Sequence, residues 1–190
     1  MQKHKQKLRK NILNQRQALP PPQWQEKSQQ ICDRLLSLPL FNEAKTILAY
    51  FSFRQEPDLS PLFNFPVQWG FPRCVDRSLV WHLWQPGETL QIGKYGISEP
   101  LTTASTITPQ EVDLIIVPTV ACDRRGYRLG YGGGFYDRLL NSPEWIHIPT
   151  VGVVFDFAYL SQLPVDYWDI KLNYICTENT NDCIYKHPVK

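Results

Sequence analysis

Glycine and arginine are concentrated in one short stretch, D-R-R-G-Y-R-L-G-Y-G-G-G-F-Y-D-R-L-L, which covers residues 123–140. Five of the ten glycines of the chain lie inside this stretch, in a span of nine residues: Gly126, Gly130, Gly132, Gly133 and Gly134. Glycine adopts positive φ angles and lets backbone N–H groups approach a ligand without a Cβ in the way. Four arginines lie beside them, and a guanidinium binds phosphate oxygens in a fork geometry (Arg124, Arg125, Arg128 and Arg138). The stretch therefore predicts a phosphate-binding loop.

Two familiar phosphate loops are excluded by their spacing. A Walker A loop requires Gly-Lys followed by Ser or Thr, and no such triplet follows these glycines. A dinucleotide fingerprint starting at Gly130 requires glycine at position 135, where the chain has Phe135. A solvated surface loop is the alternative that the glycines alone would allow, but the neighbouring arginines favour a phosphate site.

The elements that must position this loop can be read from the hydrophobic pattern. An apolar segment over 113–120 predicts a strand entering the loop, and 134–142 predicts a helix leaving it, with its positive end at the anion. Further strands are expected at 46–53, 79–84, 150–155 and 173–177, and further helices at 4–17, 22–37 and 58–65. The alternation predicts an α/β fold, a single-domain layered sandwich over residues 1–190 with a central, mostly parallel sheet flanked by helices.

The charge distribution is uneven along the chain. The 190 residues carry 20 Lys+Arg against 18 Asp+Glu, a net charge of +2. Residues 1–25 hold six basic residues and no acidic one, so the remainder has 14 basic against 18 acidic residues, or −4. Composition alone would allow a solvated helix face or an RNA contact at the start. The acidic remainder argues against a protein that coats nucleic acid.

The expected cellular compartment rests on three sequence signals that we do not find. No apolar run approaches the roughly 18 residues typical of a membrane span, and the first residues do not resemble a secretory signal. The five cysteines form no C-x-x-C pair, which is typical of reduced thiols. We therefore expect a cytoplasmic monomer that binds small molecules, with no nucleic acid or membrane partner.

Several segments, in order, resemble the 5-formyltetrahydrofolate cyclo-ligase family, whose members are also called 5,10-methenyltetrahydrofolate synthetases. The resemblance rests on the loop R-L-G-Y-G-G-G-F-Y-D-R-L-L and on K-Q-K-L-R, A-Y-F-S-F-R-Q-E-P-D-L, G-K-Y-G-I-S-E-P and L-P-V-D-Y-W-D-I-K-L-N-Y-I-C-T-E. It implies that 5-formyltetrahydrofolate and ATP, with Mg²⁺, are converted to 5,10-methenyltetrahydrofolate, ADP and phosphate. The formyl oxygen would attack the γ-phosphate, and N10 would then displace the phosphate.

The resemblance also implies roles for individual residues. ATP would be bound by Lys5 and Arg9, four residues apart on one helix, and by the loop residues Arg128, Leu129, Gly130, Tyr131, Gly132, Gly133, Gly134, Phe135 and Tyr136. Arg128 would stabilise the transferred phosphate, with no covalent nucleophile. Asp137 and Asp169 would bind magnesium, and Phe51 and Glu56 the folate. From the residues alone, Asp137 could instead be a first-turn helix acid, Asp169 a turn residue and Phe51 part of the core.

Four positions depart from the family pattern: Thr119, Cys122, Ala158 and Trp168. They leave the loop intact and bear on the folate pocket and the surroundings of Asp169. Two other functions remain open at this stage. One is a sugar-phosphate or acyl-transfer enzyme on a similar α/β scaffold, and the other is an anion- or RNA-binding module.

Overall fold

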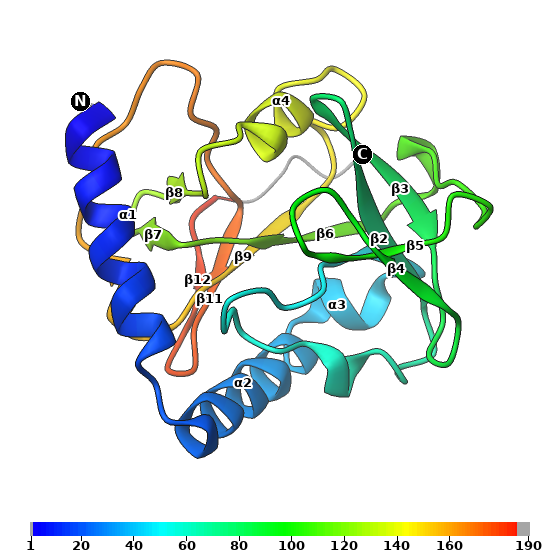
Figure 1. Ribbon diagram of the computed structural model, residues 1–190, viewed down its shortest axis with the longest axis horizontal. Coiled ribbons are helices and arrows are strands. Elements are labelled where there is room, and N and C mark those ends of the chain that lie inside the picture. The colour runs from blue at the N-terminus through cyan, green and yellow to red at the C-terminus, as the bar shows by residue number, and fades with distance from the viewer. Residues whose placement is uncertain (1, 186–190) are drawn as a thin grey trace.

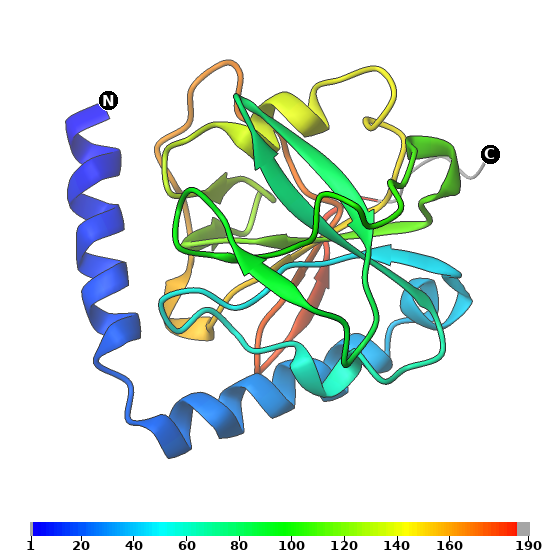
Figure 2. The same cartoon turned by 45° about the vertical axis from the view of Figure 1, so that its right-hand side comes forward.

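The computed structural model describes residues 2–185 and has a large twisted sheet with helices on both of its faces (Figure 1). The helices are α1 (Gln2–Gln17), α2 (Pro21–Leu36), α3 (Pro39–Glu43) and α4 (Phe135–Leu140). Helices α2 and α3 lie below the sheet in Figure 1 and α4 lies above it. Figure 2 shows α1 standing beside the sheet before the chain turns into α2.

The main sheet has seven strands in the order β12-β11-β9-β6-β1-β2-β3. The strands are β1 (Thr46–Leu48), β2 (Gln68–Val75), β3 (Ser78–Leu83), β6 (Leu114–Pro118), β9 (Thr150–Val153), β11 (Tyr174–Cys176) and β12 (Asn181–Cys183). All pairs are parallel except the two at the edges, β11 with β12 and β2 with β3. The predicted mostly parallel α/β sheet is therefore confirmed.

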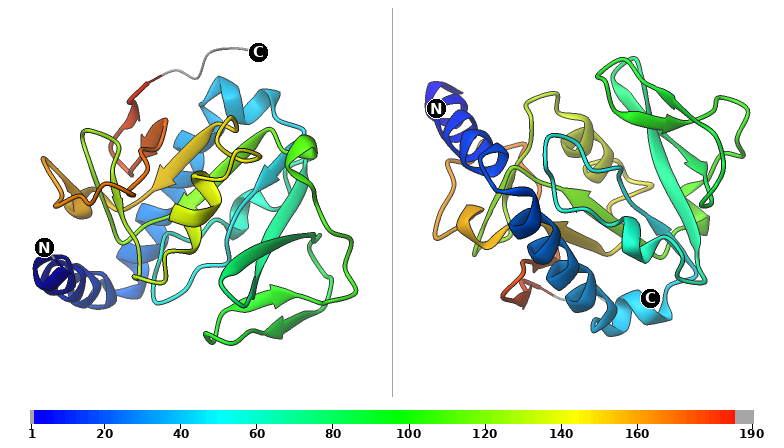
Figure 3. Two further views of the ribbon diagram at one scale, coloured as in Figure 1. Left: turned by 90° about the horizontal axis from the view of Figure 1, so that it is seen from above. Right: turned by 60° about the horizontal axis from the view of Figure 1, so that its bottom comes forward.

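Two smaller sheets complete the fold. Strands β7 (Ala121–Asp123) and β8 (Arg128–Leu129) form a hairpin that pairs with β10 (Tyr159–Leu160). Strands β4 (Leu90–Ile92) and β5 (Ser98–Pro100) form a separate hairpin. Figure 3 shows α1 at one end of the molecule and the β4–β5 hairpin at the other. The main sheet thus separates two layers, and the hairpin β7–β8 carries the glycine-rich segment.

Each face of the main sheet buries its own hydrophobic cluster. On one face, Ile31 and Leu35 of α2 and Phe41 of α3 pack fully buried against the sheet. The opposite cluster includes Ile12 of α1, together with Leu139 and Leu140 of α4. A strand buried on both faces reads as a continuous apolar run, which is why the sheet strands are recognisable in the sequence.

Several predicted elements are shorter in the structure. The strand expected over 46–53 ends at Leu48, because the chain leaves the sheet for a turn in which Arg54 and Gln55 have positive φ. The helix expected over 58–65 is only a 3₁₀ turn at Ser60–Leu62, and Pro66 disfavours its continuation because the residue before a proline avoids the helical conformation. The helix expected over 134–142 has six residues, Phe135–Leu140, so its dipole is weaker than a long helix would provide.

The remaining predicted elements agree to within a few residues. Helix α1 buries Ile12, while Leu8 and Leu13 are half-buried, and α2 begins at Pro21, as the proline run predicts. No helix among residues 2–185 is long and apolar enough to cross a membrane. All five cysteines are free thiols.

Candidate active site

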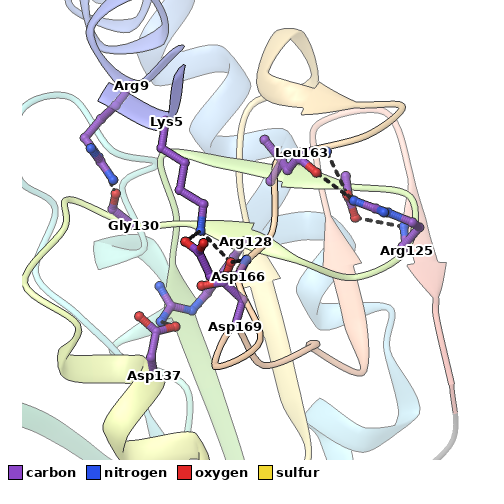
Figure 4. Close-up of polar contacts among 10 residues, drawn as sticks. Lys5, Arg9, Arg125, Arg128, Gly130, Asp137, Leu163, Asp166 and Asp169 are labelled. Atoms are coloured by element: carbon purple, nitrogen blue, oxygen red, sulfur yellow. Dashed lines mark hydrogen bonds and ion pairs between the residues drawn. The ribbon is translucent and has the colours of Figure 1, made fainter. Parts of the chain in front are cut away.

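Helix α1 meets the glycine-rich loop through Arg9. Its guanidinium Nε donates to the carbonyl oxygen of Gly130 at 2.7 Å. A Cβ at Gly132 would lie 3.6 Å from the same guanidinium, so the loop runs directly beside Arg9. Figure 4 shows Arg9 reaching down from α1 to this loop. Two segments about 120 positions apart in the chain are therefore brought together, as the resemblance implied.

One turn of α1 earlier, Lys5 binds two carboxylates from the C-terminal part of the chain. Its ammonium lies 2.8 Å from Oδ2 of Asp166 and 2.5 Å from Oδ2 of Asp169 (Figure 4). Asp169 also accepts from the backbone N–H of Asp166, which closes the turn on itself. Burial lowers the pKa of Lys5, but the two carboxylates outweigh burial and leave that pKa raised. Lys5 is thus firmly protonated.

Arg128, on β8, is the third cation of the cluster. Its side chain is buried and donates to Asp137 of α4 at 2.6 Å, whereas the Asp137 side chain remains 27% exposed. The Tyr136 ring lies 5.5 Å from the guanidinium carbon. A Cβ at Gly130 would come within 2.8 Å of the guanidinium, so a larger residue there would have to displace the end of the Arg128 side chain. Three cations, Lys5, Arg9 and Arg128, therefore converge, with Asp137, Asp166 and Asp169 beside them (Figure 4).

Within the loop, Gly132 has a φ of +101° and Gly134 a φ of +68°, conformations that side-chain-bearing residues rarely adopt. Gly134 caps α4, while Tyr131, Gly132 and Gly133 are exposed. Leu129 differs from its neighbours, because its side chain lies in the hydrophobic core and anchors the loop. The loop therefore exposes backbone next to the three cations.

Asp123, which the sequence reasoning did not single out, holds the hairpin that carries Arg128. It is fully buried and accepts from the backbone N–H groups of Arg125, Tyr127 and Leu163. The Arg125 guanidinium also binds it at 2.6 Å. The signal was available in D-R-R-G, since an aspartate shortly before a glycine is typical of a turn closed by the carboxylate.

Glu56 lies in a second, deeper part of the site. Its side chain is buried, with Oε2 accepting from the Phe53 N–H at 3.1 Å and Oε1 without a partner. Burial raises its pKa to about 7, although Arg16, the Phe53 N–H and Tyr131 each lower it. Tyr131 connects this region to the glycine loop, because its hydroxyl lies 3.4 Å from the Phe53 carbonyl oxygen.

Phe51 lies in an aromatic cluster and not in the phosphate cluster. Its half-buried ring stacks on Phe71 at 4.0 Å and meets Trp84 edge-on at 5.1 Å. Phe63 completes the cluster. Phe51 therefore packs against the hydrophobic core, and its side chain is only partly buried.

The unusual positions Thr119 and Cys122 contact each other. The Cys122 thiol lies 3.5 Å from the Thr119 hydroxyl, which donates to the Val153 carbonyl. Burial raises the pKa of Cys122 to about 12. Ala158 is buried in the core, whereas Trp168 is exposed beside Asp169. Two of the four departures, Thr119 and Cys122, are therefore neighbours in the structure.

The acidic side chains of this region show whether it could hold a metal ion. Among residues 2–185, no three His, Cys, Asp or Glu side chains cluster as a metal-binding set. Asp137 and Asp169 each face a cation instead. Two carboxylates suit a magnesium ion that takes most of its ligands from phosphate and water, so the residues fit a cation that arrives with a triphosphate.

Several buried polar atoms near this region have no hydrogen-bond partner in the described part of the chain. They are Oε1 of Glu56, Nε of Arg128 and the hydroxyl of Tyr136. Buried polar atoms are usually hydrogen-bonded, and an unpaired one needs an explanation. Two of these groups are neighbours, because the Arg128 guanidinium lies over the Tyr136 ring. A polar ligand would supply the missing partners.

Comparison with known proteins gives a consistent result. Residues 1–178 match the model of the 5-formyltetrahydrofolate cyclo-ligase family. The chain is 35% identical over 179 residues to the 5-formyltetrahydrofolate cyclo-ligase of Escherichia coli, covering 87% of this chain and 96% of the relative. It is 29% identical over 186 residues to the Mycolicibacterium smegmatis enzyme of that name, covering 91% and 93% of the two chains.

Solved structures agree with the sequence matches. The structure of 5,10-methenyltetrahydrofolate synthetase from Aquifex aeolicus superposes with a TM-score of 0.85 at 32% identity, covering 98% of this chain and 95% of that one. The synthetase structure from Mycoplasma pneumoniae has a TM-score of 0.73 at 24% identity, covering 92% and 98%, which shows the shared fold.

Proposed function

The chain belongs to the 5-formyltetrahydrofolate cyclo-ligase family, and from this premise we propose that it closes 5-formyltetrahydrofolate to 5,10-methenyltetrahydrofolate with cleavage of ATP. The observation that carries the proposal is the convergence of Lys5, Arg9 and Arg128 on an exposed glycine loop, next to the buried carboxylate of Glu56. One part of this site suits a triphosphate and the other a neutral, N–H-rich ring.

The phosphate part works by exchange of partners. Lys5 and Arg128 are held by carboxylates, and phosphate oxygens would replace those carboxylates as acceptors. Asp137 and Asp169 would then be free to hold a magnesium ion, which when bound would offset the phosphate charge. The exposed backbone of the loop from Gly130 to Tyr136 would cover the phosphates.

The folate part is built around Glu56. A carboxylate accepts from the N–H groups of a pterin ring, and among residues 2–185 no hydrogen-bond donor pairs with Oε1 of Glu56. Burial raises the pKa of Glu56, and the N–H donors of a bound ring would favour its ionised form. The edge of Phe51 would pack against the flat ring.

The reaction then needs positioning more than side-chain chemistry. The formyl oxygen attacks the γ-phosphorus, the bond to the ADP oxygen breaks, and ADP leaves. N10 attacks the activated carbon and gives up its proton, the carbon–oxygen bond breaks, and phosphate leaves with that oxygen and takes up the proton. Arg128 stabilises the charge on the transferred phosphoryl group, and no covalent intermediate with the protein is formed.

One assay tests the proposal. Purified protein is mixed with 5-formyltetrahydrofolate and Mg-ATP, and methenyl absorbance is followed together with ADP release. We expect product only when both substrates are present, with one ADP per product. ATP binding without product formation would reject the cyclo-ligase function. ADP release driven instead by a sugar or an acyl acceptor would support the alternative enzyme classes.

A further inference from the structure

Arg16 is the buried exception among the basic residues of α1. Lys3, Lys7 and Lys10 are exposed, whereas Arg16 is only 2% exposed. A buried arginine without good partners is costly, so the groups that its guanidinium meets reveal what it does. It belongs to neither of the phosphate contacts described for Lys5 and Arg9.

The guanidinium of Arg16 joins three separate segments. Its Nε donates to the Arg54 carbonyl oxygen at 3.0 Å, and Nη1 lies 3.5 Å from the Thr119 carbonyl oxygen. Its Nη2 donates to the hydroxyl of Tyr131 in the glycine loop. One side chain therefore touches the turn before Glu56, the end of β6 and the proposed nucleotide loop.

None of these acceptors is charged. In the described part of the chain, the titratable groups that face Glu56 are Arg16 from α1, Tyr131 from the loop, Tyr50 after β1 and Tyr136 from α4. Arg16 is the cation of this set, and it lowers the pKa of Glu56.

The turn around Arg54 and Gln55, whose Arg54 carbonyl accepts from Arg16, has a strained backbone. Arg54 and Gln55 have φ angles of 49° and 55°, and such left-handed residues cost on the order of 1 kcal/mol or more each. The turn is also held from α2, where Trp24 donates to the Glu56 carbonyl at 2.9 Å. Without Arg16 the Arg54 carbonyl loses this donor, and the turn that carries Glu56 is no longer linked through Arg16 to Tyr131.

We propose that Arg16 is a positioning residue that couples the two substrate subsites, because its guanidinium fixes Tyr131 of the nucleotide loop and the turn carrying Glu56 in one mutually compatible arrangement. This inference rests on the proposed function. Occupation of the loop by nucleotide would then favour folate binding beside Glu56, and the reverse, by the same factor. Lysine cannot replace arginine here, since a single ammonium cannot span acceptors on three segments.

The first test measures this coupling directly. The protein's Kd for the magnesium complex of a non-hydrolysable ATP analogue is measured with and without saturating 5-formyltetrahydrofolate. Its Kd for 5-formyltetrahydrofolate is measured with and without the analogue. We expect each ligand to tighten the other about fivefold or more in the unmodified protein. Arg16→Lys should bring that factor close to 1, and so should Tyr131→Phe, which removes one hydroxyl from an exposed residue and leaves the buried arginine in place.

The second test separates positioning from general stability. Arg16→Gln removes the charge facing Glu56 and should move the acidic limb of the folate-binding pH profile upward by about one pH unit, whereas Arg16→Lys should move it little. Lys7→Gln, on the exposed face of the same helix, should leave both the profile and the coupling unchanged. A purely structural role would lower thermal stability without moving the pH midpoint.

The outcomes are distinguishable. Suppose that the unmodified protein turns over both substrates but neither ligand changes the Kd of the other; the coupling role is then rejected and the proposed function stands. The same conclusion follows if the mutual tightening persists in both Arg16→Lys and Tyr131→Phe. If the unmodified protein binds neither ligand, the proposed function fails, and this inference fails with it.

Discussion

Lys5 and Asp169 are 164 positions apart in the chain, yet the ammonium nitrogen lies 2.5 Å from the carboxylate oxygen. This pair, with Asp166, ties the start of α1 to the turn before β11, while Arg9 ties it to the glycine loop. Inside the molecule, Lys5 is therefore neutralised by carboxylates, whereas Arg9 is held by an uncharged carbonyl oxygen. The +6 charge of residues 1–25 belongs partly to one site and is not a uniformly solvated face.

The first prediction concerns Lys5. Lys5→Met should weaken binding of the magnesium–ATP analogue by about ten- to hundredfold, because one charge-assisted hydrogen bond to phosphate contributes roughly 1.5–3 kcal/mol. Isothermal calorimetry measures the change. Lys3→Met, at an exposed position of the same helix, is the matched control and should bind normally. Equal affinities in the two variants would remove Lys5 from the nucleotide site.

Arg128 should matter for turnover more than for folate binding. Arg128→Met should lower kcat by about a hundredfold or more, since it removes charge stabilisation of the transferred phosphoryl group, while the folate Kd stays nearly constant. Arg124→Met changes an exposed arginine of the same segment and serves as the control. The reverse pattern, lost folate affinity with normal kcat, would contradict the assigned role.

Asp137 should set the magnesium requirement. Asp137→Asn keeps an acceptor for Arg128 but removes the negative charge, so half-maximal activity should need a several-fold higher magnesium concentration. Activity is titrated with magnesium at fixed ATP. Glu144→Gln removes an exposed charge shortly after α4 and should leave the titration unchanged. An unaltered magnesium titration in Asp137→Asn would assign Asp137 to Arg128 alone.

Glu56 should leave a signature in the pH dependence of stability. Its folded-state pKa of about 7 lies above its ordinary value of 4.5, so unfolding releases a proton between these values and stability falls as the pH rises through this window. Glu56→Gln should flatten the dependence of the unfolding free energy between pH 5 and 8, as followed by urea denaturation. Glu26→Gln, an exposed change on α2, should keep the slope of the unmodified protein.

Substitutions at two glycines should distinguish an effect on backbone strain from an effect on nucleotide binding. Gly132 and Gly87 have φ angles of +101° and +94°, and a Cβ would clash at neither. Alanine at either position should cost about 1 kcal/mol of stability. Only Gly132→Ala, beside Arg9, should also weaken nucleotide binding. Equal nucleotide affinity in the two variants would mean that the conformation of the loop at Gly132 does not serve ligand binding.

The sequence alone predicted the parts of this protein that depend on local chemistry. The glycine loop, the basic first helix and the buried parallel strands each have a pattern that short-range physics enforces, such as Pro21 opening α2 and the apolar run of β6. The ordered motifs also identified the family, which the comparisons confirmed. Where local rules competed with distant contacts, the predictions were wrong, as at the strand that ends at Leu48.

Only the tertiary structure decided which distant residues meet. Nothing in the spacing of Lys5, Asp166 and Asp169 says that they pair, and Arg16 is indistinguishable in sequence from the exposed cations of its helix. The physical reason is that such contacts depend on how the chain crosses between parallel strands, which places segments side by side without regard to their separation. The sequence supplied the charged and flexible groups, and the packing of α1 against the loop and the strained turn determined which of them form one site.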